Sequence, residues 1–340
     1  MDAADAQVGQ GELTTVADDE AVVHVGAQVR TYDELPADTV LELDGFTTRT
    51  LPRRGELLSR ITTVNDVHFG ETVAGHIDGA EGFETFSVGP GETPYPELMN
   101  AGAVKEMAAR EPDLVVAKGD LTSNGTEEEY QRFLEVYGDA FGDRLVHVRG
   151  NHESYPGLQR AAWPMQERHL PGVTVAVLDT SRDGRVNGDL SADQLEWLDE
   201  LASRADRPVL VFGHHPVWNP HEEARTDDVF GIVPDATEAL DEVFARRPAL
   251  LGYFAGHTHR NRVVRLPGSG KPFVEVACVK DYPGTWAEYR VYEGVILQVH
   301  RRISTPEALE WSERTRHMFG GLYQGYAFGR LDERCFALDV

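Results

Sequence analysis

The sequence predicts an α/β fold, because short apolar segments that suit strands alternate with segments that suit helices. The predicted buried strands are residues 58–67, 114–117, 145–148, 173–178, 209–212 and 250–255. The predicted helices between them include residues 95–111, 126–137, 191–203 and 237–246. The chain has 340 residues, 41% hydrophobic and 26% charged, so it is long and apolar enough to bury a full core.

Strand-like sequence also precedes this core. The first twenty residues are predicted to be a loose tail, and residues 21–51 alternate apolar and polar side chains, which is typical of a small set of strands. Residues 52–55, which read Pro-Arg-Arg-Gly, then mark a boundary. We therefore expect a tail and a small β-rich extension over residues 1–55, followed by a main domain over residues 56–303.

Within the main domain, local signals indicate the type of several elements. Thr126 is followed three residues later by Glu129, a capping-box pattern that opens a helix. Residues 273–299 hold three strand-like runs in succession, which suits antiparallel pairing. Residues 75–96 are rich in Gly, Pro, Glu and aromatic side chains, so this segment is either a lid over a site or a surface loop.

The C-terminal part, residues 304–340, begins with Ser-Thr-Pro-Glu, a helix-opening signature. It continues into an aromatic and Gly-rich segment that carries Tyr323, Tyr326 and Phe328. These side chains either form the surface of a homodimer or seal the core.

Charge and composition exclude several classes of protein. The chain has 32 Lys and Arg against 57 Asp and Glu, a net charge of −25, so it has little material for the basic stripe that nucleic acids require. No stretch of about 18 apolar residues is present, and we expect no membrane partner. The acidic N-terminus has no secretory pattern, and Cys278 and Cys335 are too few for a disulfide scaffold, so we expect a cytoplasmic location.

Five short polar clusters each follow directly on a predicted strand. They are Asp66-Val67-His68, Gly119-Asp120, Gly150-Asn151-His152-Glu153, Gly213-His214-His215-Pro216 and Gly256-His257-Thr258-His259. Because ligands of α/β sheets gather at the carboxyl ends of strands, the clusters are expected to converge on one place. Asp, Asn and His are ligands for zinc or a divalent transition metal. Their number exceeds the needs of one four-coordinate zinc and fits two ions that share a bridging carboxylate, for which Asp120 is the central candidate.

In this order the five clusters resemble the motifs of the calcineurin-like metallophosphoesterase family, over about residues 60–265. The resemblance implies a four-layer α/β sandwich of two mixed β-sheets flanked by helices, with a two-metal site at the strand ends. Within the family the chain is most similar to the bacterial cyclic nucleotide phosphodiesterase branch (class III), which also contains glycerophosphodiesterases. The gap of 54 residues between Asp66 and Asp120 is longer than is usual in that branch.

Carried over position by position, the resemblance implies a set of metal ligands and one catalytic residue. The first ion would be bound by Asp66, His68 and His259, the second by Asn151, His214 and His257, and both by Asp120. His152 resembles the catalytic histidine of the family. His214 is preferred to His215 because the family pattern reads His-x-Pro. Asn65 either supports the first ligand or only closes a turn. The donor set accepts Mn, Fe, Zn or Co.

These features predict a metal-dependent phosphoesterase that hydrolyses a small phosphodiester of the cyclic nucleotide or glycerophosphodiester type. Two divalent ions a little under about 4 Å apart would hold the phosphate oxygens and lower the pKa of a bound water, and the resulting hydroxide would attack phosphorus in line with the leaving group. His152 would steady the developing charge or protonate the leaving oxygen.

Three other functions remain as alternatives. A phosphomonoesterase would use the same ions, although few basic residues lie near the motifs beyond Arg149, Arg260 and Arg262. A nuclease is disfavoured by the acidic balance and by the absence of a long coiled-coil insertion. A non-catalytic interaction scaffold is disfavoured because every expected ligand position is filled.

Overall fold

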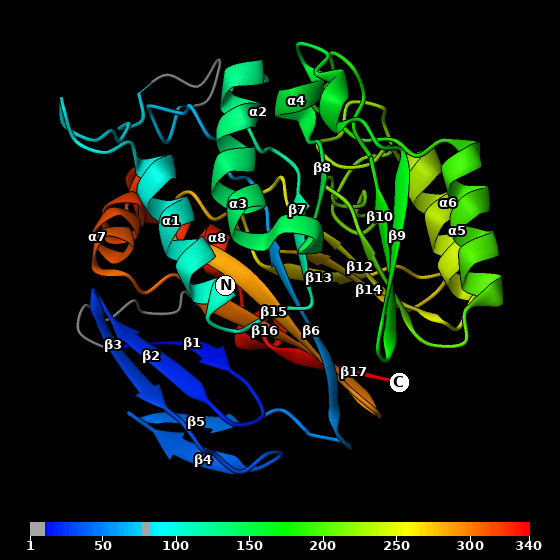
Figure 1. Ribbon diagram of the computed structural model, residues 1–340, viewed down its shortest axis with the longest axis horizontal. Coiled ribbons are helices and arrows are strands. Elements are labelled where there is room, and N and C mark those ends of the chain that lie inside the picture. Colours follow the sequence, from blue (N-terminus) through cyan, green and yellow to red (C-terminus); the bar gives the residue numbers. More distant parts are fainter. Residues whose placement is uncertain (1–10, 77–81) are drawn as a thin grey trace.

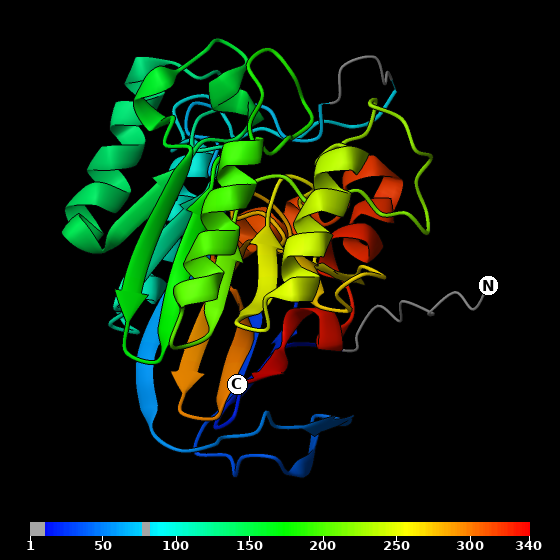
Figure 2. The same cartoon turned by 90° about the vertical axis from the view of Figure 1, so that its right-hand side faces the viewer.

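Two six-stranded β-sheets stack face to face at the centre of the protein, and helices cover the outer face of each sheet (Figure 1, Figure 2). The structure is a computed structural model that describes residues 11–76 and 82–340. Apolar side chains such as Val116, Val175 and Phe212 fill the space between the sheets. The prediction of a four-layer sandwich of two mixed sheets is therefore confirmed.

The first sheet has the strand order β17-β16-β15-β6-β7-β8. Its strands are β6 (Leu57–Val64), β7 (Leu114–Lys118), β8 (Leu145–Val148), β15 (Thr285–Tyr292), β16 (Val295–Arg302) and β17 (Phe336–Asp339). Strands β6, β7 and β8 are parallel, whereas β15 is antiparallel to both β6 and β16. Its outer face packs against α1 (Tyr95–Ala108), α2 (Glu127–Phe133), α7 (Pro306–Thr315) and α8 (Leu322–Phe328).

The second sheet has the strand order β13-β14-β12-β11-β10-β9. Its strands are β9 (Met165–Leu170), β10 (Val173–Leu178), β11 (Val209–Phe212), β12 (Leu250–Ala255), β13 (Arg262–Arg265) and β14 (Pro272–Glu275). The four inner strands are parallel, and the edge strands β9 and β13 are antiparallel to their neighbours. Helices α5 (Ala192–Arg204) and α6 (Pro234–Arg246) cover its outer face.

Side-chain caps fix the starts of two helices. The Thr126 hydroxyl accepts a hydrogen bond from the Glu129 amide at 3.2 Å, which confirms the predicted capping box at the start of α2. Ser191 and Gln194 form the same arrangement at α5. The shorter helical segments are η1 (Leu134–Gly138), α3 (Asp139–Phe141), η2 (Gly142–Arg144), α4 (Asn151–Ser154), η3 (Gln159–Ala161), η4 (Met318–Gly321) and α9 (Leu331–Arg334).

The three strand-like runs of residues 273–299 do not all pair in succession. Strand β15 does pair antiparallel with β16, as predicted. Strand β14, however, lies in the other sheet, where it pairs parallel with β12 and antiparallel with β13. The expectation was wrong for this strand because the segment between β14 and β15 carries the chain from one sheet to the other.

The N-terminal extension forms two small antiparallel sheets below the sandwich (Figure 1). They contain β1 (Glu12–Val16), β2 (Ala21–Val25), β3 (Gln28–Tyr32), β4 (Val40–Leu43) and β5 (Phe46–Arg49). The predicted loose tail is therefore wrong from Glu12 onward, because β1 pairs with β2 and its Thr15 hydroxyl donates to the His300 carbonyl at 2.8 Å. Residues 1–10 of that tail lie outside the described residues.

Buried ion pairs join this extension to the main sandwich. The Glu20 carboxylate, 6% exposed, accepts hydrogen bonds from Arg290 at 2.7 Å, from Arg110 at 3.1 Å and from Arg301. Asp18 is bonded to the same Arg290 guanidinium at 2.6 Å. These contacts cross from the turn after β1 to strands β15 and β16 and to the segment after α1, so the extension is fixed by charge as well as by packing.

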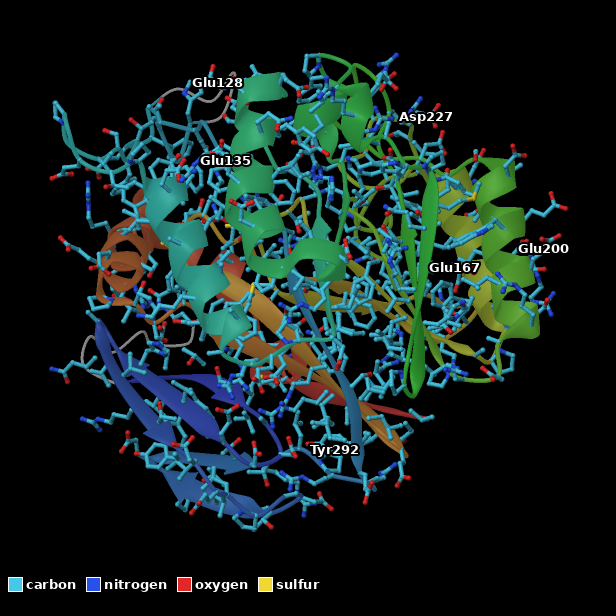
Figure 3. All side chains as sticks on the ribbon, in the orientation of Figure 1. Glu128, Glu135, Glu167, Glu200, Asp227 and Tyr292 are labelled. Atoms are coloured by element: carbon cyan, nitrogen blue, oxygen red, sulfur yellow. The ribbon has the colours of Figure 1, made fainter. Side chains whose placement is uncertain are left out.

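Many of the acidic residues that give the chain its net charge of −25 lie on the outer surface. Glu128, Glu135 and Glu200 are exposed on helical segments at the periphery (Figure 3). Such residues keep the surface hydrated and negatively charged. No helix within the described ranges is long and apolar enough to span a bilayer.

Candidate metal centre

The five polar clusters meet at one edge of the sandwich. Asp66 and His68 follow β6, Asp120 follows β7, Asn151 and His152 lie in α4 after β8, His214 follows β11, and His257 and His259 follow β12. Each cluster leaves the carboxyl end of a strand in one of the parallel parts of the two sheets. The structure therefore brings together all eight side chains that the sequence singles out.

Asp120 lies at the centre of the group. Its Oδ2 atom is 3.4 Å from Nε2 of His214, 3.6 Å from Nε2 of His68 and 4.0 Å from Nε2 of His152. Its Oδ1 atom accepts the His152 amide at 3.0 Å. Burial raises the pKa of Asp120, but His214 and His152 outweigh that effect and hold the pKa well below its usual range. The carboxylate is thus ionised and surrounded by imidazoles from three different loops.

Asp66 is held by backbone and side-chain donors. It accepts the His257 amide at 3.1 Å and the Asn65 side-chain amide at 2.5 Å, and its Oδ1 lies 3.5 Å from Nε2 of His259. Asn65 is fully buried and also donates to the Val276 carbonyl at 3.0 Å. The sequence left two roles for Asn65, and these contacts favour the one in which it supports Asp66. Its side-chain amide fixes the orientation of the Asp66 carboxylate.

The Asn151 side chain lies beside His214. Its Oδ1 is 3.2 Å from Nε2 of His214, while Nδ1 of that ring is 2.8 Å from the Lys118 carbonyl. Burial lowers the pKa of His214, but Asp120 opposes this more strongly and raises the pKa to about 9. The backbone contact at Nδ1 sets the ring so that Nε2 points into the centre.

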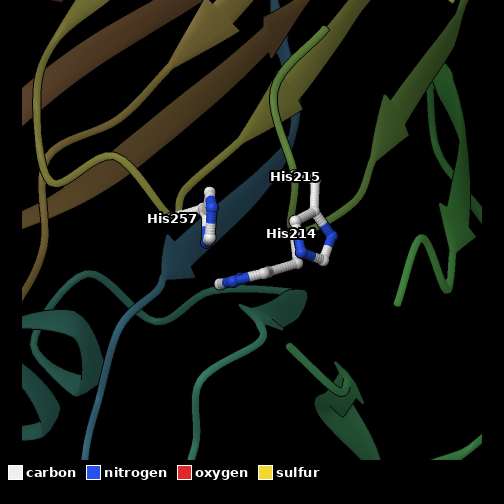
Figure 4. A group of neighbouring side chains, drawn as sticks. All are labelled: His214, His215 and His257. Carbon is white, nitrogen blue, oxygen red and sulfur yellow. The ribbon is translucent and has the colours of Figure 1, made fainter. Parts of the chain in front are cut away.

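Three histidines, His214, His215 and His257, lie close together with their rings steeply inclined to one another, and the ring centroids are 4.7–5.1 Å apart (Figure 4). Both ring nitrogens of His215 have hydrogen-bond partners. Nδ1 lies 2.8 Å from the Thr180 hydroxyl, and Nε2 lies 3.1 Å from the Val186 carbonyl. This arrangement favours His214 as the ligand of the pair. Nε2 of His257 lies 2.9 Å from the carbonyl of Phe230, which leaves Nδ1 as its available nitrogen.

The backbone at the centre is strained. Positive φ angles between 49° and 70° occur at Asp66, His68, Asp120, His257 and His259. Such conformations cost about 1–3 kcal/mol each for a residue with a side chain and cluster at functional sites. The surrounding fold therefore holds the donors in place against a local preference for other conformations.

Glycines allow the loops to approach closely. A Cβ atom at Gly119, where φ is +89°, would lie 2.6 Å from Nδ1 of His214. A Cβ atom at Gly150 would lie 2.2 Å from Oδ1 of Asp120. Both glycines precede a predicted ligand, so they are needed for the geometry of the centre.

The donor set fits divalent metal ions. The ligand atoms of Asp66, His68 and His259 lie within 4.8 Å of one another, as do those of Asp66, Asp120 and His214. Both ring nitrogens of His68 are buried without a hydrogen-bond partner, which is rare for a polar group in a folded protein. A bound cation would satisfy such a nitrogen, so the side chains present are suited to metal binding.

His152 occupies the open side of the centre. Its Nδ1 lies 2.6 Å from the Ser123 carbonyl, and 31% of its side chain is accessible. Its ring centroid is 4.4 Å from that of His68. The ring is therefore fixed at Nδ1, and its Nε2 lies beside the predicted metal ligands.

Two carboxylates that the sequence did not assign support the centre. Glu153, fully buried, accepts the amides of Thr122 at 2.8 Å and Gly150 at 2.7 Å, which ties the loop after β7 to the loop after β8. Burial and the nearby Asp120 raise the pKa of Glu153 to about 7. Glu71 lies 3.5 Å from Nδ1 of His68 and is bonded to Lys280 at 2.7 Å.

A cavity of about 440 Å³ opens beside the centre. Besides His257 and His259, it is lined by Gly75, His76, Phe230, Lys280, Asp281 and a group from the C-terminal part that includes Met318, Tyr323 and Tyr326. The sequence had placed those tyrosines at a dimer surface or a core seal and had not connected them with the site. Because these tyrosines lie far from the motifs in the sequence, no sequence pattern indicated that they line a cavity beside the site.

The segment 75–96 begins and continues close to this cavity. Gly75 and His76 line it, and Phe83 packs edge-to-face on Phe319 with ring centroids 5.4 Å apart. Residues 77–81 lie outside the described part of the chain, and a lid over the site stays a prediction.

The fold and the centre define an α/β sandwich protein with a His and Asp cluster suited to divalent metals. A profile of the family described as Calcineurin-like phosphoesterase matches residues 59–261, more than half of the chain. The protein is therefore a member of the calcineurin-like phosphoesterase family, as the five clusters predict.

Curated relatives include proteins named as phosphodiesterases. A probable glycerophosphodiester phosphodiesterase of Arcobacter nitrofigilis is 29% identical over 163 residues, 44% of this chain and 57% of the relative. A probable cyclic nucleotide phosphodiesterase of Synechococcus is 29% identical over 166 residues, 47% of this chain and 63% of the relative. The 3′,5′-cyclic adenosine monophosphate phosphodiesterase of Escherichia coli K12 is 30% identical over 224 residues, 62% of this chain and 73% of the relative. The chain thus spans less than two thirds of the first two relatives.

Among solved structures, a dimetal phosphatase from Danio rerio superposes with a TM-score of 0.55 at 20% identity. The match covers 73% of this chain and 98% of that protein. At this level of identity the similarity supports the fold.

Proposed function

We propose that the protein is a two-metal hydrolase that cleaves a small phosphodiester of the cyclic nucleotide or glycerophosphodiester type. The observation that carries the proposal is Asp120, a buried carboxylate within 4.0 Å of imidazoles from three loops. This is the arrangement that a carboxylate bridging two cations requires. The names of the relatives support the diester reaction.

The chain supplies two groups of ligands. One ion would be held by Asp66, His68, His259 and Asp120, and the other by Asp120, Asn151, His214 and His257. The ions, which we propose to be Mn, Fe, Zn or Co, would neutralise phosphate oxygens and lower the pKa of a water molecule when bound. Neutral imidazoles and ionised carboxylates are the required ligand forms. Burial lowers the pKa of His68 to about 4, whereas His214, whose pKa Asp120 raises to about 9, would release its proton when metal binds.

His152 is the proposed catalytic residue. Its Nδ1 is fixed at the Ser123 carbonyl, so Nε2 is the atom that holds a proton for the leaving oxygen. Its amide is bonded to Asp120, which couples its position to the bridging ligand. The side chain is partly accessible, as a residue that contacts substrate must be.

Charge favours a diester over a monoester. Arg149 is paired with Asp179, Arg260 with Glu275 and Arg262 with Glu222. These three arginines lie close to the motifs in the sequence, and each is already paired with a carboxylate, while Lys118 is buried and donates to the Ala255 carbonyl at 2.7 Å. A diester, with one negative charge, needs less additional cationic compensation than a monoester dianion.

Composition supports the remaining parts of the proposal. The net charge of −25 favours a small-molecule substrate over nucleic acid. Cys278 and Cys335 are free and buried, which supports a reducing compartment such as the cytoplasm. A homodimer stays a prediction.

The test compares bis(p-nitrophenyl) phosphate with p-nitrophenyl phosphate on metal-stripped protein before and after addition of Mn. We expect no turnover without metal, recovery with Mn and a higher kcat/KM for the diester. A preference for the monoester would support the phosphatase alternative, and no turnover with two ions bound would support the scaffold.

Asp120→Asn is the matched variant for the same test. Because the bridging carboxylate contacts both proposed ion sites, we expect both ions to be lost together and turnover to disappear. Metal content measured by mass spectrometry checks this. Retention of one ion at full occupancy would show that Asp120 does not bridge.

A further inference from the structure

The cavity beside the metal centre has no role in the chemistry at phosphorus proposed above. Its volume of about 440 Å³ is within the range of sites that bind small organic molecules. His257 and His259 contribute to the lining, so the cavity adjoins the position proposed for the phosphate. The organic part of a phosphoester bound at the centre would therefore extend into it.

Two aromatic rings of the cavity are fixed to the loop that carries these histidines. The Phe230 ring lies on the His257 ring, with centroids 4.1 Å apart and planes inclined by 30°. The Tyr326 hydroxyl donates to the Thr258 carbonyl at 2.9 Å. Phe230 is nevertheless 54% exposed and Tyr326 43% exposed, so both retain surface that a ligand can cover.

The polar groups nearby are already engaged inside the protein. Lys280 donates to both oxygens of Glu71 at 2.7 Å. Asp281 accepts the Tyr323 hydroxyl at 2.6 Å and the Cys278 thiol at 2.9 Å. A ligand rich in hydroxyl groups, such as a glycerol ester, would lose water there and would have to compete with these internal bonds.

A planar aromatic group fits this lining better. Four aromatic residues, Phe230, Phe319, Tyr323 and Tyr326, line the cavity. Aromatic rings stack favourably on nucleobases and other planar groups, and the contact tolerates different ring types.

We propose that this cavity is a specificity site for a planar aromatic substituent of the phosphodiester, a nucleobase or an aryl ring, in preference to glycerol. Phe230 and Tyr326 are its specificity-determining residues. The inference rests on the proposed function and selects between the two substrate types named there. It also gives the C-terminal part of the chain, beyond the family match at residues 59–261, a direct part in substrate choice.

The experiment measures inhibition of bis(p-nitrophenyl) phosphate hydrolysis by thymidine 5′-phosphate and by glycerol 3-phosphate. Both inhibitors present the same phosphate group to the metal ions and differ in the organic part. We expect the wild type to bind thymidine 5′-phosphate about tenfold more tightly than glycerol 3-phosphate. This difference corresponds to the binding energy of one stacking contact. In Tyr326→Ala and Phe230→Ala this preference should fall to about twofold or less.

Tyr326→Phe is the matched control, because it keeps the ring and removes the hydrogen bond to Thr258. It should retain the preference, and metal content should be unchanged in all three variants. Titration calorimetry of the Mn-loaded proteins with each inhibitor gives the same comparison without turnover.

The outcomes separate the two proposals. If the wild type hydrolyses the diester but shows equal affinities, or if both alanine variants keep the preference, the inference is wrong while the proposed function stands. If no hydrolysis occurs, the proposed function fails, and calorimetry alone decides whether the cavity selects an aromatic group.

Discussion

The two ring nitrogens of His152 have different surroundings. One ring nitrogen contacts the Ser123 carbonyl at 2.6 Å, and the other lies 4.0 Å from Asp120. The candidate metal ligand His214, in contrast, is completely buried. This difference in exposure is consistent with the roles proposed for these two side chains.

For His152→Ala we expect both ions to remain and kcat to fall by about 10²- to 10⁴-fold, because proton transfer to the leaving oxygen is lost. Steady-state kinetics and metal analysis on the same sample check this. Loss of metal with an unchanged rate per occupied site would contradict the assigned role.

At the residue scale, the sequence predicted the site residues that belong to a motif. It missed the residues that reach the site from outside any motif. Asp66 and His68 are close in the chain and follow a strand, so their spacing alone indicates a paired function. Phe230 and Tyr326 reach the same cavity from distant segments. Only tertiary packing brings these two residues together, and neither belongs to a sequence motif that indicates a function.

At the scale of elements, the metal centre depends on tight connections after the strands. Gly150 ends the loop after β8, and a Cβ atom there would lie 2.5 Å from the Asp120 amide nitrogen as well as 2.2 Å from its side chain. The backbone atom cannot move without shifting the strained loop after β7.

Gly150→Ala should therefore destabilise the fold by about 1–3 kcal/mol and lower metal affinity, since the two loops must separate. Gly138→Ala is the control, because its Cβ atom would contact nothing closer than 3.9 Å within a helical segment. Urea unfolding and a metal titration measure both effects. Equal behaviour of the two variants would show that loop contact is not required.

Strands made of apolar side chains were predictable, including the edge strand β8, whereas edge strands rich in polar side chains were not. The apolar runs at 145–148, 173–178, 209–212 and 250–255 coincide with β8, β10, β11 and β12, whereas the strand predicted over 58–67 ends three residues earlier, at Val64 of β6. The edge strands β9, β13 and β17 were missed, because strands such as β9, with the sequence MQERHL, carry polar side chains toward solvent. The strands that pair with β14 are likewise determined by the route of the chain between the two sheets. The local sequence of β14 does not indicate them.

At the scale of the whole molecule, buried carboxylates connect the N-terminal extension to the sandwich. Arg301, Arg110 and Arg290 outweigh the effect of burial and lower the pKa of Glu20 from 4.5 to about 2. The folded state therefore favours the ionised carboxylate. Its contribution is complete above the unfolded pKa of about 4.5 and is lost as the pH falls toward 2.

We expect Glu20→Gln to lose about 3 kcal/mol of stability at pH 7 and to show a flatter decline in stability between pH 5 and pH 2. Glu42→Gln, an exposed change in the same extension, should behave like the wild type. Urea unfolding at several pH values provides the comparison. Parallel pH profiles for all three proteins would show that this ion pair does not hold the extension.

The bonds between distant segments bear on how the protein is made in the cell. The Arg334 guanidinium donates to the Thr14 carbonyl at 2.8 Å across 320 positions of sequence, and the Val16 amide contacts the Cys335 sulfur at 3.4 Å. A ribosome releases the N-terminal strands first, yet the residues that receive them are translated about 320 residues later. The extension must therefore wait, unpaired on that side, until synthesis has passed Arg334, and a chaperone that recognises exposed strand edges would have that interval in which to act.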